Sequence, residues 1–424
     1  MPEENLNREL ENMIGETDIK VPGLGVIIFK DGKEIFSKFL GVRNVENKKP
    51  VTRQTRFRAA SVSKMFTIFS VMQLVEQGKI NLDSDASEYL NFSLRNPNFP
   101  QKKITVRNLA SHTSSLRDGK IYSIPPEISI REFFYPEGKF FEGGAHFAKE
   151  TVGEFFSYCN LNYGILGTII ENVTGKRFDI YQRENILTQL ETKAEYLPAN
   201  FDDAEFENLG TVYQKKNSDG IWNEFGEWFG KADDFKGIKP KKNFVTLQNP
   251  YDENFQKEFS LKNYRAGTNA TIFSPQGGLR ISFEELANTL EMLMNEGIFH
   301  GKKILRKNSV REIFTPQWIY NPKNKNGNNY NGAILSYSLG IYFIDGKSSA
   351  RVCKNREINF VGHTGEAFGM LSGLFFIPNT KTGFIYMMNG EAIAEDSDPR
   401  SFGKFSGNYI WEEKIMNAIC ENLL

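Results

Sequence analysis

The stretch RFRAASVSKMFTIF, residues 56–69, is the most informative part of this 424-residue chain. Apolar residues at helical spacing run from Ala60 to Gly78, which predicts a buried helix that ends at a glycine. Ser61 and Lys64 stand in its first turn. A lysine is seldom buried without a partner, because taking its ammonium out of water is costly. Lys64 therefore either lines the exposed edge of the helix or has been placed beside the serine hydroxyl.

The second alternative has a chemical rationale. A serine hydroxyl is a poor nucleophile and needs a base within hydrogen-bond reach. Residues three apart share a helical face, so Ser61 and Lys64 would lie one above the other. The helix N-terminus would add free N–H groups and partial positive charge, which can lower the pKa of the lysine and stabilise an oxyanion. By itself, however, S-x-x-K is a short pattern that recurs by chance, and a capping serine with a solvent-facing lysine produces it equally well.

Two further segments favour the chemical interpretation. FSYCNLNYGILGTIIENVTG, residues 156–175, places Tyr158 and Asn160 just before a predicted buried helix. NFVGHTGEAFGM, residues 359–370, places the triplet His-Thr-Gly, which begins at His363, at the end of a predicted strand. Each has an ordinary explanation as a core aromatic, a helix cap or a satisfied histidine. Together with S-x-x-K they follow the chain order S-x-x-K, S-D-N, K-T-G of one catalytic signature.

On these motifs the chain resembles the serine β-lactamase-like family, which includes class C β-lactamases, D-Ala-D-Ala carboxypeptidases, D-aminopeptidases and related esterases. The resemblance runs from about Gly23 to Asn389 and includes NLASHTSSL, SPQGGLRIS and FFIPNTKTGFIYMMNG. It implies the penicillin-binding-protein fold, in which a mixed α/β domain and a helical domain hold the active site between them. Within NLASHTSSL, we expect His112 to be a buried structural histidine.

The resemblance also implies catalytic roles. Ser61 would attack the substrate carbonyl and form an acyl-enzyme, which water then hydrolyses. Lys64 and Tyr158 would move the protons, and which of the two takes the proton of the serine stays open. The backbone N–H groups of Ser61 and Glu366 would form the oxyanion hole.

The implied substrate-binding residues are Asn160, His363, Thr364 and Gly365. Asn160 would hold an amide of the substrate, and the strand through the triplet would pair with an extended substrate. Dedicated β-lactamases usually carry lysine at the position of His363. A histidine, with an ordinary pKa of about 6.5, attracts a carboxylate less strongly. Glu366 would add negative charge if it faced the cleft, so we expect substrates that are neutral or positively charged there.

The expected function is a serine hydrolase of the β-lactamase/penicillin-binding type that cleaves an amide (a β-lactam or a D-amino-acid peptide) or an ester. A carboxylesterase is the alternative within that class. A non-catalytic penicillin-binding-like protein that binds peptides or peptidoglycan fragments is the alternative outside it. The expected partner is thus a small-molecule or peptide substrate.

Composition argues against several other functions. Lys+Arg and Asp+Glu both number 52, the net charge is zero and no basic stripe occurs, so no nucleic acid is expected to bind. No apolar run approaches the roughly 18 residues needed to span a bilayer. Cys159, Cys353 and Cys420 are far apart and odd in number, which predicts neither a disulfide framework nor a zinc knuckle. The histidines lack metal-binding spacing, so neither a metal nor a cofactor is expected.

Predicted strands lie toward both ends of the chain and predicted helices in the middle. We therefore expect a mixed α/β (α+β) fold, with an antiparallel β-sheet from residues 1–60 and 265–424 flanked by helices, and a mostly helical domain, residues 61–264, inserted between them. Residues 200–260 form an irregular insertion, either a lid over the site or an extra packing element. The N-terminus lacks the apolar core of a signal peptide, which leaves a cytoplasmic protein or an exported one whose leader has been removed.

Overall fold

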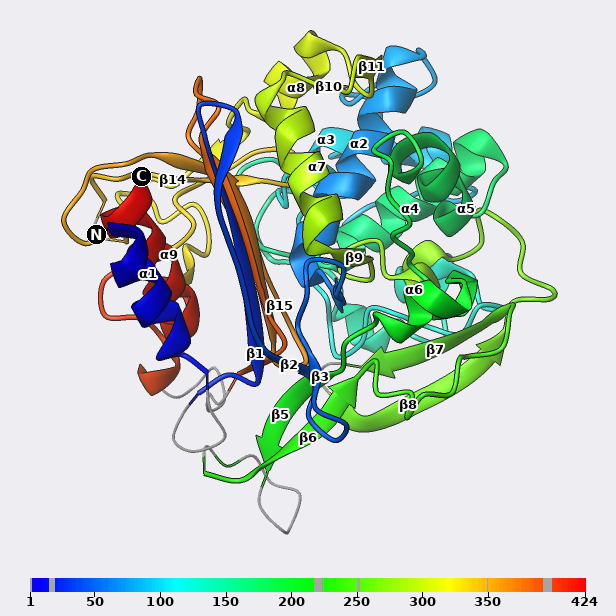
Figure 1. The fold of residues 1–424 in the computed structure, drawn as a ribbon. Coiled ribbons are helices and arrows are strands. Elements are labelled where there is room, and N and C mark those ends of the chain that lie inside the picture. Colours follow the sequence, from blue (N-terminus) through cyan, green and yellow to red (C-terminus); the bar gives the residue numbers. More distant parts are fainter. Residues whose placement is uncertain are drawn as a thin grey trace.

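The structure is a computed structural model that describes residues 2–14, 20–216, 223, 225–249, 252–348, 350–391 and 399–424. Its largest sheet has the order β12-β13-β14-β15-β16-β17-β1-β2-β3, and its strand pairs are antiparallel. The strands are β1 (Gly23–Lys30), β2 (Lys33–Asn44), β3 (Lys49–Pro50), β12 (Trp318–Ile319), β13 (Ser336–Tyr337), β14 (Tyr342–Ile344), β15 (Phe360–Ala367), β16 (Met370–Phe376) and β17 (Gly383–Met388). Both ends of the chain thus meet in one sheet, as predicted (Figure 1).

Helices cover both faces of this sheet (Figure 1). α1 (Pro2–Glu11) and α9 (Ile410–Leu423) pack together on one face, and α7 (Phe283–Met294) lies against β1, β16 and β17 on the other. Side chains alternate accordingly along β1: Leu24, Val26 and Ile28 belong to the core beneath α1 and α9, whereas Ile27 and Phe29 belong to the core on the α7 side. Two covered faces explain why the strand is an almost continuous apolar run.

The remaining helices lie on the α7 side of the sheet (Figure 1). Their bounds are α2 (Ser63–Glu76), α3 (Val106–Ala110), α4 (Leu161–Thr174), α5 (Phe178–Gln182), α6 (Asp203–Glu207) and α8 (Lys307–Ile313). α2 and α4 are buried along most of their length. Residues 111–160 contain less helix than expected, because glycines and prolines break the chain into turns and the short 3₁₀ helices η3 (Ile130–Phe133) and η4 (Glu142–Gly144). The predicted domain boundaries stay a prediction.

The insertion contains α6 and two hairpins. The first joins β5 (Val212–Lys216) to β6 (Glu227–Ala232), and the second joins β7 (Phe244–Asn249) to β8 (Asp252–Ser260). β18 (Gly390–Glu391), which follows β17, pairs with β5 and ties the first hairpin to the sheet domain. These short strands are joined by loops; Trp222, one of the aromatic residues of the insertion, lies outside the described residues.

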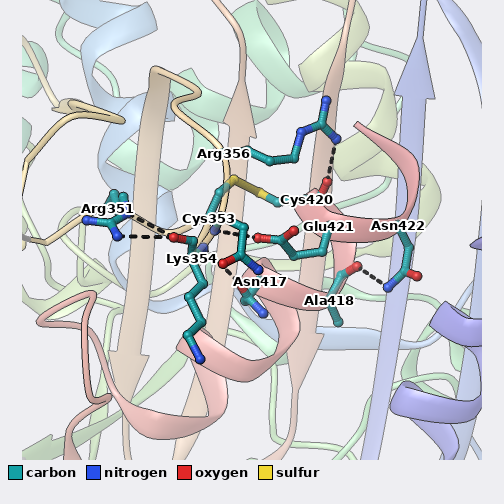
Figure 2. The surroundings of a disulfide bond; sticks show 10 residues. Arg351, Cys353, Lys354, Arg356, Asn417, Ala418, Cys420, Glu421 and Asn422 are labelled. Atoms are coloured by element: carbon teal, nitrogen blue, oxygen red, sulfur yellow. Dashed lines mark hydrogen bonds between the residues drawn. A yellow bond between two sulfur atoms is a disulfide. The ribbon is translucent and has the colours of Figure 1, made fainter.

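A disulfide bond joins Cys353 to Cys420 in α9 (Figure 2). The backbone N–H of Lys354 donates to Asn417 Oδ1 at 2.9 Å, and Arg356 donates to the carbonyl oxygen of Cys420 at 2.9 Å. The prediction from cysteine spacing missed this pair, because the fold brings together residues 67 apart in sequence. The bond fixes the loop between β14 and β15 to the C-terminal half of α9.

Candidate active site

The position of Lys64 decides between an exposed helix edge and a place beside the serine hydroxyl. Ser61 lies in the 3₁₀ helix η1 (Ala60–Val62), directly before α2. Lys64 is completely buried, and its Nζ donates to Ser61 Oγ at 2.9 Å. The same Nζ also donates to Asn160 Oδ1 at 2.9 Å and to the carbonyl oxygen of Gln276 at 3.0 Å. Lys64 therefore faces the serine in the interior and does not line an exposed edge.

Burial changes the acidity of Lys64. Desolvation lowers the pKa of Lys64 to about 7, although the nearby carboxylate of Asp118 acts in the opposite direction. The Nζ also lies over the faces of two aromatic rings, 4.7 Å from the centroid of Tyr158 and 5.4 Å from that of Tyr163. Ring faces favour the cation, but the loss of water outweighs them. A substantial fraction of Lys64 is thus the free amine at neutral pH, and a free amine can accept a proton.

Asp118 fixes the side chain of Asn160, which in turn contacts Lys64. Asp118 was not among the site residues predicted from the sequence. Its Oδ2 accepts from Asn160 Nδ2 at 2.9 Å, and its Oδ1 accepts from the backbone N–H of Leu161 at 2.8 Å. Desolvation raises the pKa of Asp118. Because Asp118 holds the amide nitrogen of Asn160, the amide oxygen is left facing Lys64. The predicted role of Asn160 toward substrate stays a prediction.

Tyr158 and His363 lie next to each other in the site. Burial raises the pKa of Tyr158 well above 10, with hydrogen bonding to Ser61 opposing it. The Oη atoms of Tyr158 and Tyr337 lie 3.4 and 3.2 Å from His363 Nε2, while His363 Nδ1 contacts the carbonyl oxygen of Thr364. A proton on Nδ1 satisfies that carbonyl and leaves Nε2 to accept from the phenols. Burial, with help from the charge of Lys64, lowers the pKa of His363 to about 3, so the ring is neutral.

His112 is buried, as expected, and it positions the tyrosine. Its Nδ1 accepts from the backbone N–H of Cys159 at 3.1 Å, and its ring centroid lies 4.3 Å from that of Tyr158. Desolvation lowers the pKa of His112 well below its ordinary value. The neutral ring thus fixes both the backbone and the ring of the segment that carries Tyr158.

Strand β15 passes the serine with one edge open. It pairs with β16 from Val361 to Ala367, but β14 reaches only as far as Gly362 on the other side. Within the described residues, no further strand pairs with that edge beyond Gly362, so an extended ligand could lie along it. Gly365 lies against the serine, because a Cβ there would be 2.9 Å from the Ser61 nitrogen.

A cavity of about 670 Å³ opens in front of the serine. Lys64 and Gly365 lie behind its wall, and the other predicted site residues line it: Ser61, Tyr158, Asn160, His363, Thr364 and Glu366. Within the described ranges no cluster of His, Cys, Asp and Glu could hold a metal ion, and no helix is long and apolar enough to cross a bilayer.

Two segments of the chain contribute cavity-lining residues that were not predicted from the sequence. The insertion contributes Gln214, Lys231 and Leu247, so it shapes the cavity rather than only packing on the helical side. The chain just before and within α9 contributes Tyr409 and Glu412. Burial raises the pKa of Glu412 to about 8, and its Oε1 accepts from the hydroxyl of Tyr386 at 2.9 Å.

Known proteins resemble this chain in sequence. Protein flp of Staphylococcus aureus strain MRSA252 is 26% identical over 213 residues, which are 49% of this chain and 41% of protein flp. The mitochondrial serine beta-lactamase-like protein LACTB of Bos taurus is 36% identical over 118 residues, 26% of this chain and 20% of LACTB. The match therefore spans less than half the length of each of these relatives.

Solved structures share its fold. A penicillin-binding protein homologue from Pyrococcus abyssi, described as octameric, has a TM-score of 0.59 at 21% identity and covers 99% of this chain and 75% of its own. The penicillin binding protein from Bacillus halodurans has a TM-score of 0.61 at 18% identity over 98% of both chains. These likenesses confirm the predicted mixed α/β fold class. A profile of the beta-lactamase family matches residues 10–404, and this chain therefore belongs to the beta-lactamase family.

Proposed function

We propose that this protein is a serine hydrolase that cleaves an amide or ester through an acyl-enzyme on Ser61. The observation that carries the proposal is the buried amine of Lys64, 2.9 Å from Ser61 Oγ and with a pKa of about 7. A general base is most effective when its pKa lies near the working pH. Lys64 meets this condition and already contacts the atom whose proton must leave.

The acid–base roles follow from the two pKa shifts. Tyr158 stays a phenol at neutral pH, because its pKa is raised well above 10, whereas Lys64 is partly unprotonated. Lys64 Nζ therefore accepts the proton as Ser61 Oγ attacks the carbonyl carbon. Tyr158 relays a proton to the leaving group, whose bond to the carbonyl carbon then breaks. Water hydrolyses the resulting ester by the reverse proton path.

The oxyanion would be held by the backbone N–H groups of Ser61 and Glu366. The close approach of Gly365 to Ser61 supports this assignment, since it brings the two segments into contact. Donors fixed before reaction stabilise developing charge without reorganisation.

The charges on the His363 side favour substrates that are neutral or positive there. His363 is neutral and its Nε2 faces two phenols, so it supplies no cation for a carboxylate. Glu366 lines the cavity. Peptides with a free amino end, amides and esters suit this wall better than a β-lactam whose carboxylate must be bound there.

Covalent labelling tests the proposal. A fluorescent penicillin and a fluorophosphonate probe are incubated with the protein, and the modified peptide is located by mass spectrometry. We expect an adduct on Ser61 that is absent in Ser61→Ala and retained in Ser123→Ala, because Ser123 also lines the cavity but donates its hydroxyl to the Thr271 carbonyl. Nitrocefin, p-nitrophenyl esters and D-amino-acid amides then rank the substrate classes. Binding of penicillin without any covalent adduct would favour the non-catalytic alternative.

A further inference from the structure

Two buried arginines beside the cavity share one carboxylate. Arg58 in β4 (Arg56–Arg58) lies directly opposite Arg280 in β9 (Arg280–Ser282). Both oxygens of Asp233 accept from Arg280, at 3.0 and 2.7 Å. The closest approach of Asp233 to Arg58 is 4.0 Å, beyond hydrogen-bond range. The carboxylate of Asp233 is thus hydrogen-bonded to Arg280 and not to Arg58. Two arginines share one negative charge, which leaves a net positive charge beside Arg58.

The guanidinium of Arg58 is enclosed and poorly satisfied. The residue is 9% exposed, and its Nε has no hydrogen-bond partner among the residues that the structure describes. Its flat face packs over the ring of Phe368, 5.3 Å from the centroid. Burial, and then the charge of Arg280, lower the pKa of Arg58 to about 10, so it remains charged at neutral pH. Nε itself is covered, but other atoms of Arg58 border the cavity, where a ligand can reach the side chain.

Arg58 lies at a defined end of the cavity. Phe368, on which it packs, immediately follows β15, whereas His363 lies nearer the start of that strand. Ser61 lies between these two ends. Tyr158, the proposed relay to the leaving group, stands beside His363. The leaving group would therefore depart toward His363, and the acyl half that stays on Ser61 would extend toward Arg58.

The other side chains at this end are compatible with an anion. Lys231, two residues before Asp233, and Gln214, which lies close to the turn after β15, both line the cavity. The carboxylate among the charges that act on Arg58 is that of Asp233, which Arg280 already holds, whereas the charge of Glu366 acts on Glu412.

We propose that Arg58 binds a carboxylate carried by the acyl half of the substrate. The inference rests on the proposed acyl-enzyme and names its substrate class: amides or esters of an acid that bears a second carboxylate, such as the half-esters of dicarboxylic acids. The planar guanidinium fork matches a carboxylate in two parallel hydrogen bonds. The bound carboxylate would remain at Arg58 while the leaving group departs and would leave with the acid product.

Matched esters test the inference. The substrates are the mono-p-nitrophenyl esters of succinic, glutaric and adipic acid, each compared with its neutral methyl ester at the far carboxyl. We expect kcat/KM of the best half-ester to exceed that of its methyl ester by about 10-fold or more, the size of one charge-assisted interaction. Arg58→Gln should abolish this preference and leave turnover of the methyl ester within about threefold, as expected for a contact absent from the neutral substrate. An equal preference in both proteins, or none in the wild type, would overturn the inference.

Two controls separate the possible failures. Arg58→Lys keeps the charge but loses the fork, so it should retain part of the preference, and it replaces Arg58→Gln if thermal unfolding shows that variant to be unfolded. Calorimetric binding of monomethyl glutarate to Ser61→Ala, with and without Arg58→Gln, tests the carboxylate contact without turnover. Loss of that binding in the double variant supports the contact even if no acyl-enzyme forms, and unchanged binding contradicts it.

Discussion

Gly365 and Ser61 are in backbone contact across the cavity wall. A Cβ on Gly365 would come within 2.9 Å of the Ser61 nitrogen and 2.6 Å of the Ala59 carbonyl oxygen. Protein interiors are close-packed, so neighbouring atoms cannot move aside to accommodate such an overlap. The third position of the His-Thr-Gly triplet is a glycine for this reason, and its lack of a side chain sets the distance between β15 and η1.

Gly365→Ala should therefore open the proposed oxyanion hole. We expect kcat/KM and the rate of fluorophosphonate labelling to fall about 100-fold or more, the effect of losing one oxyanion donor. Gly277→Ala is the matched control, because a Cβ there meets nothing closer than 3.6 Å at the same site. Full activity in Gly365→Ala, with its fold verified by circular dichroism, would contradict the assignment.

The acylation rate should depend on pH through Lys64. Its pKa is about 7, and only the free amine accepts the proton of the serine. The rate should thus rise as pH increases through about 7 and level off above it, measured as labelling rate between pH 5.5 and 9. Lys64→Arg should be slower by about 10²–10⁴-fold and lack this rise. A wild-type rate that increases only near the ordinary lysine pKa would rule Lys64 out as the base.

Glu366→Gln should change the selectivity for charged substrates. Removing a negative charge from the wall weakens attraction for an amine there and relieves repulsion of a carboxylate. We expect kcat/KM to fall several-fold for amine-bearing substrates and to rise or stay level for carboxylate-bearing ones. Glu357→Gln, on an exposed loop, controls for net charge. Equal effects on both substrate types would show that Glu366 does not contribute to selectivity.

Glu412 should make stability fall as pH rises from about 5 to 8. Its folded pKa is about 8, above the ordinary value of 4.5, so the folded state retains a proton that the unfolded state has already released. Stability therefore decreases as pH rises from about 5 to 8. At pH 8 the Glu412→Gln variant should unfold at a higher urea concentration than wild type. At pH 5 the increase in that urea concentration should be much smaller. An identical gain at both pH values would mean that ionisation of Glu412 is not the cause.

The disulfide should contribute substantially to stability. The two cysteines are 67 residues apart, and closing a loop of this length stabilises a protein by about 4 kcal/mol in the chain-entropy estimate. The double variant Cys353→Ser, Cys420→Ser should lose about 2–4 kcal/mol in urea unfolding. Reductant should lower the stability of the wild type and leave the double variant unchanged. Free thiols on Cys353 and Cys420 in non-reduced protein, found by alkylation and mass spectrometry, would contradict the bond.

The sequence revealed the parts of the site whose chemistry depends on spacing along the chain. Ser61 and Lys64 are three residues apart on one turn, and the triplet at His363 is continuous, so each is visible as a motif. Asp118 and Gln276 carried no such signal. Asp118 meets Asn160 across 42 residues and Gln276 meets Lys64 across 212, and only the tertiary fold sets these contacts.

For the fold, too, local features could be predicted from the sequence and long-range contacts could not. Strands at both ends of the chain predicted the antiparallel sheet, because the apolar runs are strong and hairpin turns such as Asp31-Gly32, with φ of 52° and 76°, are local signals. The insertion hairpins mix aromatic and charged residues, so β5 and β6 show no clear alternation. The pairing of Cys353 with Cys420 depends on how α9 packs on the sheet, which spacing does not encode.

The pairing of β1 with β17 has a consequence for biosynthesis. Leu24 lies opposite Met388, so β1 can pair with β2 early but must wait for more than 350 further residues before β17 exists. Contacts between such distant segments form slowly, because a long loop must close first. The segment around Ser61 is likewise made about 300 residues before Gly365, which it contacts. A nascent fragment therefore carries the serine without the surroundings that would activate it, and the proposed hydrolase gains its reactivity only after β15 has been made.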